Sequence, residues 1–293
     1  MSLFLQQLIG GLTFGSIYAA LALALVLVFR STGVVNFAQG SMALVTTYFA
    51  WQLSAWGLPV LLSVILVLVI AFLLGAFTEF LVIRRVDTKN HWAIIILTFG
   101  IFLILNMGVG VIWGYDAKSM SHFSLPMSTR IGSIVLTGHD LVVVVTLLAE
   151  AVGLWYLFRY TKLGLGFRAT VSSRQEAQLM GIRVGQMTTL GWGLAAVLGA
   201  VCGLLTAPRV LLEPGLMFAP LVYALAAIAL GGLDSPLGAV LASLVIGVST
   251  NLARAYLPWI GSELAIGVPL VIMVVVLLFR PQGMFGSAKL VRV

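Results

Sequence analysis

Long uncharged stretches dominate the chain. Residues 1–29, 31–78, 90–115 and 184–208 contain no Asp, Glu, Lys or Arg. A helix needs roughly 20 apolar residues to cross the hydrocarbon core of a bilayer, so each stretch is long enough for one or two crossings. The strands of membrane barrels alternate apolar and polar residues, whereas segments such as Leu61–Ile70 do not alternate. The pattern therefore predicts membrane-spanning helices.

The predicted architecture is an all-α polytopic integral membrane protein, treated as one transmembrane domain over residues 1–293. Eight to ten crossings are expected, because the second span is interrupted and the seventh is short. No Lys or Arg precedes Arg30, so the first span is expected to be retained rather than cleaved as a signal peptide. The predicted spans are 8–29, 37–55, 59–83, 92–114, 139–158, 187–207, 218–233, 236–257 and 264–279.

The basic residues predict the orientation. Hydrophobic residues make up 61% of the chain and charged residues 9%, so the sequence contains no soluble domain. The net charge of +7 therefore does not indicate nucleic-acid binding, which would need a basic soluble domain. Lys and Arg accumulate on the cytoplasmic side of membrane proteins. Nine crossings with the N-terminus outside and the C-terminus inside put 12 of the 16 Lys and Arg residues inside. The four left outside are Lys118, Arg130, Arg209 and Arg254.

One polar segment interrupts the apolar pattern. Between residues 159 and 183, five basic residues accompany one acid, Glu176, with a membrane span on either side. Within it, residues 175–180 are predicted to form a short helix that Ser172 or Ser173 caps and Gly181 ends. Such a segment below the membrane is expected to be either a docking surface for a soluble partner or an ordinary solvated loop.

Two glycine-flanked breaks are candidates for a transport pathway. Residues 33–40 place Asn36 and Gln39 between glycines, and residues 231–238 combine a turn, a cap at Asp234 or Ser235 and a proline. Irregular backbone at membrane depth is tolerated inside protein or beside water, so both breaks are expected near a pathway; the alternative is a plain interfacial turn. The residues predicted to border the pathway are Asn36, Phe37, Gln39, Gly40, Gly231 and Gly232.

A few polar and small residues inside the spans also carry information. Glu150 lies near the middle of its span and is expected either to line the pathway or to bond a neighbouring helix. Glu79 can reach the membrane interface and is interpreted as an anchor. Asn106 and Thr98 are expected to hold helices together. Close helix contacts, within a tight bundle or at a subunit interface, are predicted at the pairs Gly11/Gly15, Gly110/Gly114 and Gly199/Gly203.

The sequence argues against an enzyme. It lacks the phosphate-binding G-x-x-x-x-G-K-[ST] motif, and a G-x-G-x-x-A match at residues 164–169 follows a membrane helix instead of a strand, so it is interpreted as a flexible hinge. His91, His122 and His139 lack metal-ligand spacing, and Cys202 is the single cysteine. No catalytic residue and no metal ligand is therefore predicted. Residues 115–138 are expected to form a lid or contact surface on the outside.

Four ordered motifs resemble the LivH-type permeases of branched-chain amino-acid ABC importers. They are GSIYAALALALVLVFRSTGVVNFAQG, RATVSSRQEAQLMGIRV, ALGGLDSPLGAVLAS and LLFRPQGMFG, and the similarity covers essentially the whole chain. The resemblance implies an ABC importer permease fold in the bacterial inner membrane. It also implies a second, LivM-like permease, two LivG/LivF-like ATP-binding subunits and a periplasmic or lipid-anchored binding protein. ATP would be used by those partner subunits, and this chain would bind no cofactor.

The same resemblance makes residues 159–186 a cytoplasmic coupling loop that contacts the ATPase subunits. Its pattern falls on Arg168, Arg174, Glu176, Ala177, Gly181 and Ile182, whereas Gln39 departs from the His of many relatives. Branched-chain amino acids are the implied substrates, and urea, amides and aromatic acids are alternatives within the family. An ion-coupled secondary transporter using Glu150, or an oligomeric channel, is the alternative outside it.

Overall fold

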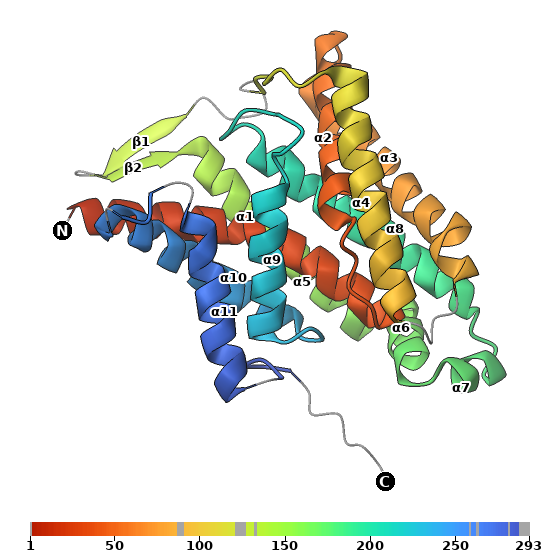
Figure 1. Cartoon of the computed structure of the whole chain (residues 1–293). Coiled ribbons are helices and arrows are strands. Elements are labelled where there is room, and N and C mark those ends of the chain that lie inside the picture. Colours follow the sequence, from red (N-terminus) through yellow and green to blue (C-terminus); the bar gives the residue numbers. More distant parts are fainter. Residues whose placement is uncertain are drawn as a thin grey trace. The chain divides into compact units, whose positions relative to one another are not determined.

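The structure is a computed structural model that describes residues 2–86, 91–120, 127–131, 134–257, 259–261, 264–280 and 282–286. Figure 1 shows a helical protein with one small hairpin. The helices are α1 (Ser2–Thr32), α2 (Gln39–Ala55), α3 (Val60–Leu81), η1 (Ile83–Arg85), α4 (His91–Trp113), α5 (Gly138–Tyr160), α6 (Lys162–Ser172), α7 (Arg174–Leu179), α8 (Val184–Thr206), α9 (Phe218–Gly231), α10 (Pro236–Tyr256), η3 (Leu264–Ile266) and α11 (Gly267–Phe279).

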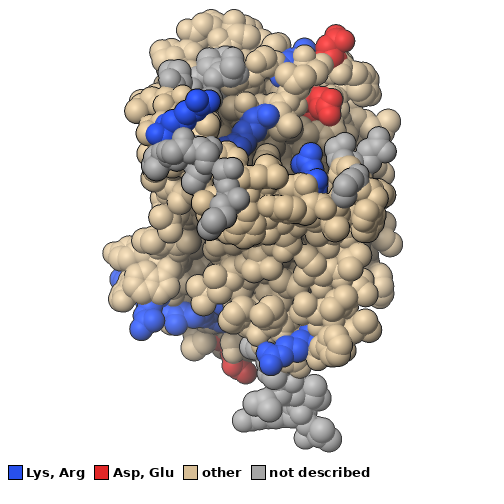
Figure 2. All heavy atoms as spheres, turned by 90° about the vertical axis from the view of Figure 1, so that its left-hand side faces the viewer, with Lys and Arg blue, Asp and Glu red and all other residues tan. Residues whose placement is uncertain are grey.

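Each predicted span coincides with a helix in the described part of the chain, and all but the 37–55 span, which becomes α2, coincide with a strongly apolar one. Six helices (α1, α3, α4, α5, α8 and α10) are long and apolar enough to cross a membrane, while α9 and the 264–279 segment are shorter. The interruption expected in the second span lies before α2, which runs unbroken from Gln39 to Ala55. Most of the face drawn in Figure 2 is uncharged. Its charged side chains, basic and acidic together, lie in areas that a wide uncharged surface separates. These helices form the fold of a multi-pass membrane protein.

The chain folds into two compact units. The first contains residues 1–26, 125–147 and 219–293, and the second contains residues 27–124 and 148–218. Both units are assembled from segments that are distant in the sequence. The expectation that both units belong to a single permease domain stays a prediction.

In the first unit, the N-terminal part of α1 packs directly on α10. A Cβ atom added at Gly11 would lie 2.6 Å from the Val248 Cα, and one added at Gly15 would lie 2.8 Å from the Leu244 Cα. Only glycine permits this approach, so the predicted close contact at the Gly11/Gly15 pair is confirmed.

A hairpin of β1 (Ser128–Ile131) and β2 (Ile134–Thr137) forms part of the segment predicted to lie outside. It is tied to α1 by the Gln6 side chain, whose Nε2 donates to the Val135 carbonyl at 3.3 Å and whose Oε1 accepts from the Val135 N–H at 3.0 Å. The amide of Gln6 thus takes the place of one neighbouring strand residue. His122 and residues 121–126 of this segment lie outside the described residues.

In the second unit, α2 packs against α3, α4 and α8, and α3 packs along α8. The pair Gly199/Gly203 lets α8 approach α2, because added Cβ atoms would meet the side chains of Gln39 and Thr47. The Gly110/Gly114 pair does not hold a tight bundle within this chain, because Gly110 faces the ring of Tyr115 and Gly114 follows the last residue of α4 with a φ of +81°. Its use at a subunit interface stays a prediction. These two glycines shape the end of a helix and make no helix–helix contact among the described residues.

Candidate coupling loop and pathway segments

The polar segment after α5 folds into two short helices, α6 and α7. Thr161 caps α6 by accepting a hydrogen bond from the Gly164 N–H at 3.0 Å. Gly164 lies against the backbone of the last turns of α5, where an added Cβ would be 2.6 Å from the Phe158 Cα. The chain therefore turns at Thr161, and Gly164 lets the start of α6 lie close against the end of α5. The flexible hinge expected at residues 164–169 was wrong, because these residues are helical throughout.

Helix α7 has the boundaries that its capping residues predict. The Ser173 Oγ accepts from the Glu176 N–H at 3.3 Å, and Gly181 adopts a φ of +80°, which favours glycine at a helix end. The Ala177 side chain is buried, so it supports the loop from within and is not on its surface. Arg168, Glu176 and Gly181 are exposed, while Arg174 and Ile182 are half-buried.

The tip of this loop carries an exposed apolar pair that sequence reasoning missed. Leu179 is 88% exposed and Met180 is 68% exposed, and both directly precede Gly181. Exposed apolar side chains in a polar loop are typical of a contact surface for a partner. The signal in the sequence was the Leu-Met-Gly step inside an otherwise polar and basic segment.

The first predicted pathway segment is buried in the second unit. Asn36 Nδ2 donates to Gln39 Oε1 at 3.1 Å, and Gln39 Nε2 donates to the Ala195 carbonyl of α8 at 2.7 Å. Asn36 Oδ1 also accepts from the Ala38 N–H at 3.0 Å. Gly40 is buried as well, and Phe37 is half-buried. The polar atoms of Asn36 and Gln39 are thus hydrogen-bonded to each other, to the local backbone and to α8. Their contact with a substrate stays a prediction.

The second predicted pathway segment lies in the first unit and is also packed. Gly232 has a φ of +105°, and the N–H groups of Met284 and Phe285 donate to the carbonyls of Leu230 and Gly231 at 2.7 and 3.1 Å. The Ser235 Oγ caps α10 by accepting from the Gly238 N–H at 3.1 Å, with Pro236 as the first helical residue. The predicted cap is thus Ser235. Contact of Gly231 and Gly232 with a pathway stays a prediction.

Glu150 lies on a buried stripe of α5. Leu147 and Leu154, one turn before and after it, are buried. Both Glu150 carboxylate oxygens are buried, and neither has a hydrogen-bond partner among the described residues. Placing a carboxyl group at membrane depth without such partners costs free energy. Ionisable residues that are found there despite this cost are typical of functional sites. Asn106, by contrast, donates to the carbonyl of Pro214 at 2.9 Å, in the segment between α8 and α9, and Thr98 donates to the Ile95 carbonyl of its own helix at 3.0 Å. The helix–helix bonds predicted for these two residues were therefore wrong.

Comparison with known proteins decides the family. A family model described as the permease component of the branched-chain amino acid transport system matches residues 7–277. The chain belongs to this permease family. The resemblance seen in the four sequence motifs is thereby confirmed.

Curated relatives of the permease match it over nearly its whole length. It is 28% identical to the high-affinity branched-chain amino acid transport system permease protein LivH of Escherichia coli K12, covering 99% of this chain and 98% of the relative. It is 28% identical to BraD of Pseudomonas aeruginosa, with the same coverage, and 30% identical to a probable LivH of Methanocaldococcus jannaschii, covering 94% and 91%.

A solved structure shares the fold of the permease. A chain of PsaBC from Streptococcus pneumoniae, solved in complex with Fab, superposes with a TM-score of 0.52 at 15% identity. The superposition covers 95% of this chain and 92% of that one. At this identity the likeness concerns the fold alone, and it agrees with an all-α permease.

Proposed function

We propose that the chain is the LivH-type permease subunit of an ABC importer that moves branched-chain amino acids across the bacterial inner membrane. The family match and the names of the full-length relatives support the substrate class. The observation that carries the mechanism is the α6–α7 loop, a capped helix whose tip exposes Leu179 and Met180 between two membrane helices.

In this proposal the α6–α7 loop faces the cytoplasm and contacts an ATP-binding subunit of the LivG/LivF type. The N-terminus is outside and the C-terminus inside. A LivM-like permease completes the pathway, and a periplasmic or lipid-anchored binding protein delivers the substrate. The chain itself hydrolyses no ATP and binds no cofactor. It carries force from the ATPases to a pathway bordered by Asn36, Gln39, Gly231, Gly232 and Glu150.

The test is ATP-driven uptake by the complete complex reconstituted in vesicles. Glu176→Ala with Gly181→Ala weakens the first turn of α7 and forces alanine into a φ of +80°, which costs roughly 1–2 kcal/mol at that residue. We expect uptake per ATP hydrolysed to fall by about tenfold, with membrane insertion and permease pairing unchanged.

Gly57→Ala is the matched control, since Gly57 has a φ of +86° and open space around it but lies between α2 and α3. It imposes the same strain away from the loop and should leave uptake per ATP unchanged. Wild-type coupling in the Glu176/Gly181 variant would refute the assignment of the loop. Uptake by the chain without any ATPase subunit would favour the ion-coupled alternative. Uptake assays with leucine, urea, an amide and an aromatic acid distinguish the candidate substrate classes.

A further inference from the structure

A buried carboxylate ties α3 to the first turns of α8, immediately after the α6–α7 loop. We propose that Glu79 and Arg84, with Thr188 and Thr189, form a clamp that transmits displacement of the loop to α3. This inference rests on the coupling role proposed above and names the residues that pass the motion into the membrane helices. We call these four residues the Glu79 clamp.

Four donors converge on the carboxylate of the Glu79 clamp. Glu79 is 3% exposed, and its two oxygens accept four hydrogen bonds. Arg84 donates to it at 3.4 Å through Nε and at 3.0 Å through Nη2. Thr188 and Thr189 donate at 2.8 and 2.6 Å from α8. A charge this deeply buried is tolerated only where donors surround it.

Arg84 closes the clamp from the other side. Its Nη2 also donates to the Gly185 carbonyl at 2.6 Å, so the guanidinium bonds the first turn of α8 directly. The guanidinium carbon lies 5.0 Å from the centre of the Phe80 ring, which fixes its plane. The sequence led us to interpret Glu79 as an interface anchor; the structure shows that it anchors α3 to another helix.

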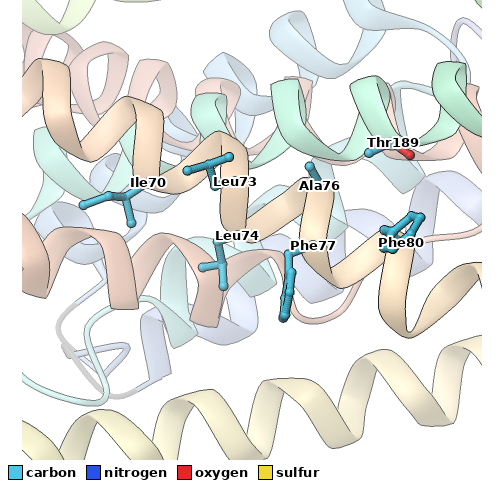
Figure 3. Close-up of a pocket in the computed structure, with 7 residues that line it drawn as sticks. All are labelled: Ile70, Leu73, Leu74, Ala76, Phe77, Phe80 and Thr189. Carbon is cyan, nitrogen blue, oxygen red and sulfur yellow. The ribbon is translucent and has the colours of Figure 1, made fainter.

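Phe80 also lines an apolar hollow of about 640 Å³ on α3, with Thr189 at its edge (Figure 3). The six α3 residues that border this hollow are all apolar, and Thr189 is its one polar neighbour. Glu79 directly precedes Phe80, so the Glu79 clamp lies at one end of the apolar stretch of α3 that borders this hollow.

The position of the clamp on α8 connects it to the loop. Helix α6 packs on the same turns of α8: an added Cβ at Gly166 would lie 2.8 Å from the Met187 Sδ, and one at Gly191 would lie 3.2 Å from the Phe167 ring. Thr188 therefore sits one residue from the position where α6 touches α8. A push on α6 therefore reaches the bonded turn of α8 through direct packing of the two helices.

Packing also joins α3 to α8 further along the pair. Gly75 lies against the backbone of Trp192, and the Phe72 ring lies on Gly193. Hydrogen bonds to a charged group are directional and stronger than those between neutral groups, so the Glu79 clamp adds a directional link to this packing at the end where the loop acts.

Two variants are designed to weaken the clamp while leaving the rest of the fold in place. In Glu79→Gln, Thr188 and Thr189 keep the Gly185 carbonyl as an acceptor, at 3.0 and 2.8 Å, and Arg84, already 38% exposed, can turn to solvent. The double variant Thr188→Val/Thr189→Val keeps the Glu79–Arg84 pair and removes only the hydroxyl bonds. Gln52→Leu is the matched control, since it removes a 3.1 Å bond between α2 and Trp113 of α4 in the same unit.

The complete complex is reconstituted with each variant, and uptake, ATP hydrolysis and thermal stability are measured. We expect both clamp variants to lower uptake per ATP by roughly three- to thirtyfold, and Gln52→Leu to leave the ratio unchanged. An unchanged ratio in both clamp variants would overturn the proposal. A ratio that falls equally in Gln52→Leu would do so too, because it would reflect stability alone. Should Glu79→Gln fail to fold, the threonine variant decides.

A cross-link supplies the rescue. Glu79→Cys/Thr188→Cys on a Cys202→Ala background should be uncoupled, and a short bifunctional thiol reagent that joins α3 to α8 should restore uptake per ATP. Failure of the linked protein to recover would count against a mechanical role. If the loop variants of Glu176 and Gly181 uncouple while the clamp variants do not, only this inference fails. If neither set uncouples, the coupling role of the loop fails with it.

Discussion

Replacing Gly75 with alanine should push α3 away from α8. The added Cβ would collide with the Trp192 carbonyl and lie 2.7 Å from the Ala196 Cβ, and neither atom belongs to a flexible side chain. Overpacking of this kind costs about 1–3 kcal/mol, and the better helix propensity of alanine returns up to about 1 kcal/mol. We therefore expect a net loss of about 1–2 kcal/mol, a factor of roughly 5–30 in the folding equilibrium.

The chain supplies its own probe for this measurement. Cys202 is its single cysteine and is buried in α8, so a thiol-reactive fluorophore labels it only as the protein unfolds. The midpoint of labelling should fall by about 2–6 °C in Gly75→Ala. Gly100→Ala in α4 is the control, because its added Cβ would have nothing within 4 Å. It should gain about 0.5–1 kcal/mol from helix propensity. A Gly75→Ala protein as stable as Gly100→Ala would refute the close packing of α3 on α8.

Two further predictions concern the pathway residues. Glu150→Gln should keep uptake within a few-fold of wild type while Glu150→Leu loses most of it, because Gln keeps a polar group that can bond water or substrate in the pathway whereas Leu removes it; equal uptake by both would show that the carboxylate is incidental. Single cysteines at Asn36 and Gln39, on a Cys202→Ala background, should react with a small water-soluble thiol reagent in an ATP-dependent manner. Protection in every nucleotide state would remove both positions from the pathway.

Features set by local chemistry were predictable from the sequence. The spans follow from runs of uncharged residues, and the ends of α7 follow from a serine cap and a glycine at positive φ. The same holds for α10, where Ser235 and Pro236 occupy the first positions. The capping signals act within one helical turn and the spans follow from a single run of residues, so no knowledge of distant segments is needed.

Features set by distant partners were not predictable. Glu79 has Arg84 within reach in sequence, but its threonine donors lie more than a hundred residues away. The three glycine pairs have the same spacing, yet only two pack against another helix, because Gly110/Gly114 stands at the end of α4. The exposure of Leu179 and Met180 likewise depends on how α6 and α7 fold back.

Helix α8 brings these observations together within the second unit. It begins at Val184 beside the loop, bonds Glu79 of α3 in its second turn, and accepts the Gln39 amide at Ala195. From 184 to 195 is 11 residues, or roughly 16 Å along the axis of a helix. The whole stretch is helical, so the two contacts belong to one continuous helix. In the proposed mechanism, displacement at the loop therefore reaches Gln39 as a rotation or shift of α8, and the Gln39–Ala195 bond is the contact where that movement would first disturb the predicted pathway.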